Sequence, residues 1–83
     1  MKPREKPLGN DNLIGARVTR LRQARHWKQT ELLARLNERG IPINASGLSR
    51  LEGQIRLVTD KELQALAAIF SISIDELVNG PKA

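Results

Sequence analysis

The side chains best suited to specific recognition lie in one stretch, Asn44–Gly53, which reads NASGLSRLEG. On a helix at about 100° per residue, Leu48 and Leu51 fall on one side of this stretch. Small polar residues and one arginine fall on the opposite side, namely Ser46, Ser49, Arg50 and Gly53. Hydroxyl and guanidinium groups can bond to base edges, and the major groove of DNA admits a helix. The pattern therefore favours a helix with one anchoring face and one face that reads base pairs.

The ends of this helix are marked by its flanking residues. Asn44 is a strong N-cap residue, because its side-chain oxygen can accept a bond from an unpaired amide of the first turn. Gly53 is suited to end the helix. We expect a short helix that begins just after Asn44.

The charge of the chain favours an anionic partner. The net charge is +5, and it is unevenly spread along the 83 residues. Residues 1–28 hold eight Lys and Arg against two acids, residues 29–58 four against three, and residues 59–83 two against four. A nucleic-acid backbone is the usual reason for such asymmetry, and a solvated basic surface is the alternative.

Catalytic and metal-binding chemistry is poorly supported. Cysteine is absent and His26 is the sole histidine, so we expect no metal site and no cofactor. Asp60 and Glu62 are explained by helix capping, and no histidine is placed to activate a serine, so we expect no enzyme. The longest apolar run, Ala65 to Phe70, is far too short for a membrane span, and a cytoplasmic location is expected.

The hydrophobic pattern predicts an all-α domain. Residues 1–10 are expected to be a disordered basic arm, and residues 11–80 one domain. Five helices are predicted, with caps at Asp11 or Asn12, Asn44, Thr59 and Ser73. Their expected ranges are 13–25, 29–39, 45–53, 60–70 and 74–78. Thr59 and Glu62 form a capping-box pattern, and Trp27 is expected to be a core anchor.

Four groups of residues, in this order, resemble the Cro/repressor-type (XRE-type) helix-turn-helix domains over about residues 13–79. They are LRQARHWKQTEL from Leu21, LSRLE from Leu48, TDKEL from Thr59, and LA from Leu66 with ISIDEL from Ile72. The resemblance implies a compact five-helix bundle of the lambda-repressor-like type, with the second and third helices forming the helix-turn-helix. The chain departs from the family where Leu33 replaces an alanine and where Gln54 stands in place of a glycine.

The resemblance also implies roles for individual residues. Base-reading positions match Asn44, Ala45, Ser46 and Arg50, to which the outward face adds Ser49. Phosphate contacts are expected from Lys28, Gln29 and Arg56, which flank the reading helix. Arg22 and Glu52 match a pair that forms a structural salt bridge in similar proteins.

These features predict a sequence-specific regulator that binds double-stranded DNA, most simply a repressor. The alternative is a protein-interaction module of the same fold, such as an antitoxin-like or adaptor domain. We further expect a homodimer, because so short a chain cannot easily bury all the apolar residues of its C-terminal third. Ile74, Leu77 and Val78 are the expected interface, and the alternative is that they only close the core.

Overall fold

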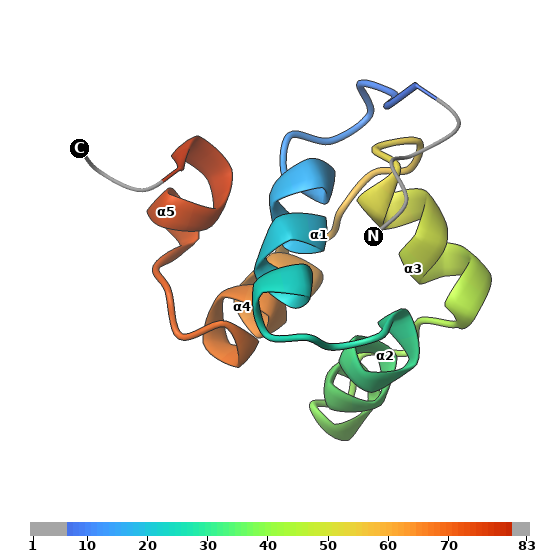
Figure 1. The fold of residues 1–83 in the computed structure, drawn as a ribbon, viewed down its shortest axis with the longest axis vertical. Helices are drawn as coiled ribbons and strands as arrows, with labels where there is room; N and C mark the ends of the chain where they lie inside the picture. Colours follow the sequence, from blue (N-terminus) through green and yellow to red (C-terminus); the bar gives the residue numbers. More distant parts are fainter. Residues whose placement is uncertain (1–6, 81–83) are drawn as a thin grey trace.

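All regular structure in residues 7–80, the part of the chain that the computed structural model describes, is helical. Five helices follow one another within this range (Figure 1). They are α1 (Gly15–Ala24), α2 (Gln29–Glu38), α3 (Ala45–Glu52), α4 (Asp60–Ile69) and α5 (Ile74–Asn79). The predicted all-α class is confirmed, and no helix in this range has the length and apolar character needed to cross a membrane.

Three of the predicted caps begin their helices as expected. The Asn44 side chain accepts a hydrogen bond from the Gly47 amide at 2.7 Å. Thr59 and Glu62 form both bonds of the capping box at the start of α4. The Ser73 hydroxyl accepts from the Glu76 amide at 3.0 Å at the start of α5. Side-chain acceptors thus occupy first-turn amides that the helices cannot satisfy themselves.

The predicted disordered arm is only partly within the described range, because residues 1–6 lie outside it. Gly9 is held in place, since its amide donates to the Gly53 carbonyl at 2.9 Å. The Asp11 amide donates to the Gln54 carbonyl at the same distance. The ordered domain therefore begins before the expected boundary at residue 11.

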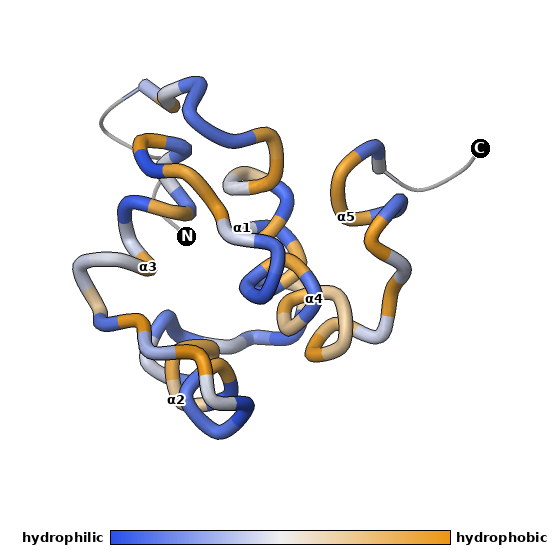
Figure 2. Tube along the Cα trace, turned by 180° about the vertical axis from the view of Figure 1, so that it is seen from behind, coloured by the Kyte–Doolittle hydropathy of each residue, from blue (hydrophilic) through white to orange (hydrophobic). Residues whose placement is uncertain are grey.

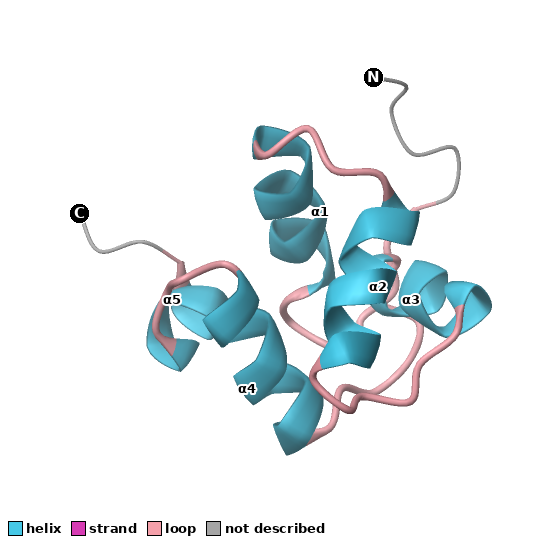
Figure 3. Ribbon diagram, turned by 90° about the horizontal axis from the view of Figure 1, so that it is seen from below, coloured by secondary structure: helices cyan, strands magenta, loops and turns pink. Residues whose placement is uncertain are grey.

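The core lies between the five helices, with α3 and α5 on opposite sides of α1 (Figures 1 and 3). Its fully buried aliphatic and aromatic side chains come from every helix or its end: Val18, Leu32, Leu36, Leu48, Leu51, Leu66, Phe70 and Leu77. Leu77 is 0% exposed, so its assignment to a dimer interface is wrong. The short α5 can lie against α4 only by burying this side chain, which is therefore part of the monomer's core.

Two arginines connect α1 to the ends of α5 and α4. Arg17 lies within α1, and Arg25 lies at its C-terminal end. Arg17 donates to the carbonyls of Leu77 and Val78 at 2.8 and 3.2 Å, at the end of α5. Arg25 donates to the carbonyls of Ile69 and Phe70 at 3.2 and 2.8 Å, at the end of α4. Cations at helix C-termini are favourable, because the last carbonyls lack partners and carry partial negative charge.

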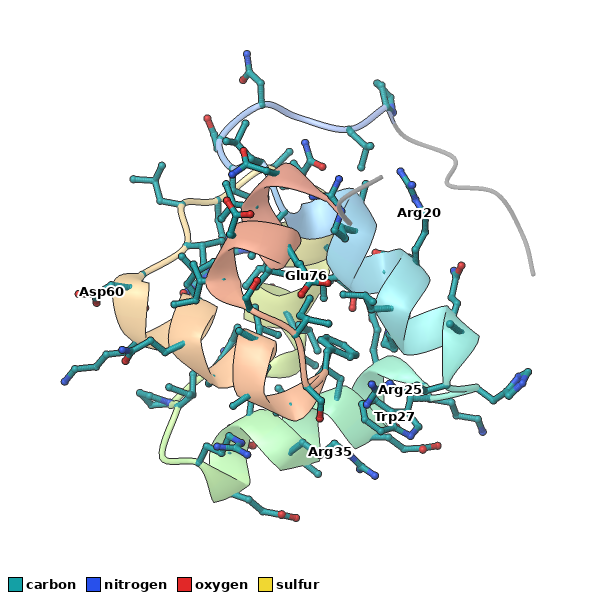
Figure 4. The ribbon with its side chains drawn as sticks, turned by 90° about the vertical axis from the view of Figure 1, so that its left-hand side faces the viewer. Arg20, Arg25, Trp27, Arg35, Asp60 and Glu76 are labelled. Carbon is teal, nitrogen blue, oxygen red and sulfur yellow. The ribbon has the colours of Figure 1, made fainter. Side chains whose placement is uncertain are left out.

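Trp27 is half-buried and joins α2 to the end of α4. Its ring stacks on Phe70 with 5.8 Å between centroids. The Arg35 guanidinium lies over the Trp27 ring, 4.0 Å from the ring centroid. Arg25, Trp27 and Arg35 accordingly gather at one edge of the molecule (Figure 4). The anchoring role predicted for Trp27 fits this packing, and the ring faces are occupied by protein groups.

The burial of Leu77 predicts the stability of two matched variants. Leu77→Ala should lower the free energy of unfolding by about 2–5 kcal/mol, because it leaves a cavity in the core. Ile74→Ala, at a position 40% exposed, should cost clearly less. Urea denaturation followed by circular dichroism measures both, and equal costs would contradict the core position of Leu77.

Candidate nucleic-acid interface

α3 has one buried face and one exposed face. Leu48 and Leu51 are fully buried, which anchors the helix against α1 and α2. The residues predicted to read bases are all exposed: Asn44, Ala45, Ser46, Ser49 and Arg50. Gly53 was expected on the outer face and is instead buried, because the segment around Gly9 covers the end of α3. The predicted outer face is otherwise confirmed as an exposed surface.

The exposed face of α3 carries one charge. Between residues 40 and 51, Arg50 is the sole charged side chain, and the nearest acids along the chain are Glu38 and the buried Glu52. Asn44 uses its Oδ1 atom to cap the helix, so the part of its side chain that can donate to a partner is the Nδ2 group. A phosphate-rich partner would therefore meet no acidic side chain from α3 itself.

The orientation of α3 is fixed by the carboxylate of Glu52, which is 2% exposed. Arg22 of α1 donates to it from Nε at 2.9 Å and from Nη2 at 3.1 Å. Thr19 of α1 and Gln29 of α2 each donate to Oε1 at 3.0 Å. The predicted Arg22–Glu52 ion pair is thus present, and it is the centre of a larger network. A buried carboxylate is tolerated because its oxygens are satisfied by these donors.

This network changes the role that Gln29 can have. Its side-chain amide points inward to Glu52, so a phosphate contact would have to come from the main-chain amides at the start of α2. Lys28 precedes this helix, is exposed, and makes no capping bond from its side chain. The open, partly positive end of α2 therefore lies close to α3, to which Glu52 ties it.

Arg56 does not have the free guanidinium that was expected of a phosphate contact. Its two terminal nitrogens bond to Glu62 at 3.0 and 2.9 Å, and its side chain is 28% exposed. The pairing follows from the capping box, which turns the Glu62 carboxylate back toward the loop before α4. Arg56 is therefore removed from the expected phosphate contacts.

A second connection, at the C-terminal end of α3, was not predicted. Gln54 has φ 59°, the left-handed conformation that favours glycine. Its side chain accepts from the Ala16 amide at 3.0 Å and donates to the Gly9 carbonyl at 3.2 Å. The glutamine at a position where the sequence pattern led us to expect glycine was the one hint of this connection in the sequence. The two bonds offset the backbone cost of about 1–2 kcal/mol.

Asn12 and Gly15 complete this connection between α1 and α3. Asn12 accepts from the amides of Ile14 and Gly15, and its Nδ2 donates to the carbonyls of Leu51 and Arg56 at 3.1 and 2.8 Å. A Cβ on Gly15 would collide with the carbonyl oxygen of Leu51, so only glycine permits this approach of the two helices. The cap predicted at Asp11 or Asn12 is wrong, because α1 begins at Gly15 and its N-cap is Ile14, which makes no cap bond from its side chain. The Asn12 side chain instead joins distant segments of the chain.

Other site chemistries have no counterpart in the described residues. No three His, Cys, Asp or Glu side chains within residues 7–80 are grouped so that they could hold a metal ion. No buried side-chain polar atom of this range lacks a hydrogen-bond partner. The outer face of α3 and the start of α2 remain the candidate site.

The Glu52 network predicts non-additive effects on stability. Arg22→Met or Glu52→Leu alone should lower the free energy of unfolding by about 3–5 kcal/mol, because each leaves a buried charge unpaired. The double variant should cost less than the sum of the two. Melting curves of the three variants test this, and simple additivity would mean that the pair is not coupled.

The Arg56–Glu62 pair predicts a pH-dependent contribution to stability. Burial raises the pKa of Glu62, but hydrogen bonds from Arg56 and Thr59 outweigh burial and place the pKa below its ordinary value. Because the pKa of Glu62 is lower in the folded state than in the unfolded state, its ionised form stabilises the protein at any pH above the ordinary pKa of about 4.3. This stabilisation is lost as the pH falls through the folded-state pKa. Glu62→Gln should therefore destabilise the protein at pH 7 and progressively less as the pH falls below about 4.

Denaturation in urea across this pH range measures the effect, with Glu38→Gln as the control, because Glu38 is exposed on α2. A penalty for Glu62→Gln that is unchanged between neutral and acid pH would contradict the assigned cause of the pKa shift.

Comparison with known proteins assigns no family or function to this chain. No protein family, curated protein or solved structure matches this chain. The candidate interface therefore stands on the arrangement of its own residues.

Proposed function

We propose that the protein is a sequence-specific regulator that binds double-stranded DNA, most simply a repressor. In this proposal the fold is a lambda-repressor-like helix-turn-helix domain, with α2 and α3 as the motif. The single observation that carries the proposal is the outer face of α3. It is exposed, free of acids and of large apolar side chains, and oriented from beneath by the Glu52 network.

The roles of the individual residues follow from their positions. Arg50 is the long donor on the outer face, and it can bond to O6 and N7 of guanine. Ser46, Ser49 and the Nδ2 group of Asn44 provide shorter contacts, and Ala45 leaves room for close approach. Lys28 and the main-chain amides at the start of α2 bind phosphates and set the position of α3 in the groove.

The same face argues against α3 as a protein-binding helix. Helices that dock on proteins need large apolar or aromatic anchors. Every large hydrophobic side chain that is exposed in residues 7–80 lies outside α3: Leu8, Leu13, Ile55, Leu57 and Ile74. Hydrogen-bonding groups without such anchors fit a groove lined by base edges better than a protein surface.

Selection of bound duplexes from a random pool, at low and moderate salt, tests the proposal. Enrichment of a common motif is expected, with affinity that falls steeply as salt increases. Absence of any enriched motif at low salt would refute sequence-specific binding.

Arg50 and Lys28 should differ in the kind of affinity they supply. Arg50→Ala should cost about 1–3 kcal/mol on the selected site and relax the preference at one base pair. Lys28→Ala should weaken selected and random duplexes alike, and lower the salt slope by about one. Fluorescence anisotropy on both duplexes measures this, and an equal loss on both from Arg50→Ala would make Arg50 a phosphate contact.

A further inference from the structure

A groove runs between α2 and α4. The helix α2 packs on both α4 and α3, and it lies between them (Figures 1 and 3). The groove consists of two hollows of about 330 and 560 Å³, which share Arg39 and Ala68 as lining residues. No residue of α3 lines either hollow. A partner in the groove would therefore not occupy the outer face of α3.

Three cations and one acid line these two hollows. Arg35 lies on α2, Arg39 at its C-terminal end, and Lys61 in the first turn of α4. Both salt bridges of residues 7–80 involve other arginines, so none of the three cations is paired with an acid of this range. The acid is Glu38, and it is exposed. The groove is therefore positive and suited to an anionic partner.

The acids beside Lys61 line neither hollow and are bonded elsewhere. The Asp60 carboxylate accepts from the main-chain amide of Lys61 at 2.8 Å. The Glu62 carboxylate accepts from Arg56 and from the Thr59 amide. These two acids accordingly stabilise the start of α4, and the ammonium group of Lys61 is left to meet a partner.

Helix stability does not account for a lysine at position 61. The first turn of a helix carries partial positive charge, which favours acids and disfavours cations. Arg35 and Arg39, by contrast, have structural roles, since Arg35 lies over Trp27 and Arg39 stands at the C-terminal end of α2. Lys61 is exposed and opposes the dipole of its own helix. A contact with an acidic partner would give this cation a role.

Small apolar side chains form the floor of the groove. Ala65 is buried and Ala68 is exposed, and both belong to α4, whose later turns are mainly hydrophobic (Figure 2). Ile41 lies beyond the end of α2 and is buried at the same hollow. Aliphatic side chains of a partner gain from covering such a floor, whereas the phosphates of a nucleic acid do not. The floor therefore favours a polypeptide over a nucleic acid.

We propose that the groove between α2 and α4 binds an acidic, amphipathic segment of a partner protein. Carboxylates of the segment pair with Arg39 and Lys61, and its aliphatic side chains cover Ala65 and Ala68. The charge of the whole chain, +5, steers an acidic partner toward it. The contact does not depend on DNA. Combined with the proposed function, it would allow one molecule to hold a DNA site on α3 and a second protein on α2 and α4.

Selection from a displayed library of random peptides tests the proposal with the protein free of DNA. Peptides of about 14 residues, roughly 21 Å long as a helix, are long enough to follow the groove. Enriched sequences should combine Asp or Glu with aliphatic residues. Absence of enrichment, or enrichment of sequences without acids, would refute the proposal.

Fluorescence anisotropy with the enriched peptide then locates the contact. Arg39→Glu and Lys61→Glu should each raise the dissociation constant of the peptide by about 10-fold, because each replaces an attraction with a repulsion. Lys61→Glu places an acid in the first turn of α4, which the helix dipole favours, so the fold should persist. Arg20→Glu is the matched control, because Arg20 is an exposed arginine of α1 away from Arg35 (Figure 4). Equal losses from all three variants would mean attraction by net charge alone and would contradict binding in the groove.

A neutral substitution tests the floor of the groove. Ala68→Leu should also raise the dissociation constant of the peptide by about 10-fold, because the larger side chain fills the hollow without changing the charge. Ala34→Leu is its control, since Ala34 is exposed on α2 and lines neither hollow. Leucine suits exposed helix positions, and circular dichroism verifies the fold of both variants. Unchanged peptide binding by Ala68→Leu would overturn the proposal.

Duplex binding separates this inference from the proposed function. Arg39→Glu, Lys61→Glu and Arg20→Glu change the net charge equally, so all three should lose about the same affinity for the selected duplex. A greater loss from the two groove variants would make the groove a phosphate contact, which is the outcome opposite to the one proposed. Failure of the wild type to bind any duplex would refute DNA binding and leave the peptide measurements valid.

Discussion

The arrangement of the first three helices depends on one buried carboxylate. Glu52 is at the end of α3, and its oxygens receive hydrogen bonds from α1 and α2. An ionised carboxyl group is costly to bury, and it is tolerated only where several donors converge. Any arrangement that separated these helices would leave the carboxylate, or the Arg22 guanidinium, buried without a partner. The pair therefore favours the arrangement in which α1, α2 and the end of α3 meet.

A second connection between α3 and α1, at the turn that follows α3, is made by neutral groups. Asn12 and Gln54 make bonds to partners 38 to 45 residues away in sequence, and Gly15 allows the two backbones to approach. Gln54 adopts a left-handed backbone conformation that glycine would adopt more easily, but a glycine could not make its two side-chain bonds. With α3 held by Glu52 and by these residues, its outer face needs no contacts with the rest of the protein. That face is consequently available for the proposed reading of DNA.

The basic residues are divided between the fold and the surface. Arg17 and Arg25 cap the ends of α5 and α4, and Arg22 and Arg56 are in ion pairs. Net charge alone thus overstates the number of cations that can face a phosphate backbone. Near α3, Lys28 and Arg50 are the exposed cations to which the proposed function assigns contacts. In the proposed function, the main-chain amides at the start of α2 supply further phosphate contacts.

The sequence by itself determined the helices, because caps and the 3.6-residue period act between neighbours along the chain. Asn44, Thr59 and Ser73 begin helices as predicted, and Leu48 and Leu51 are buried as the helical period requires. The Arg22–Glu52 pair was accessible through resemblance, since no local rule joins residues so far apart. Only the tertiary structure decided which of the residues predicted to contact DNA or a partner stayed exposed. Leu77 is buried in the core and Arg56 is paired with Glu62, because the burial and pairing of a side chain depend on what the whole fold brings to it.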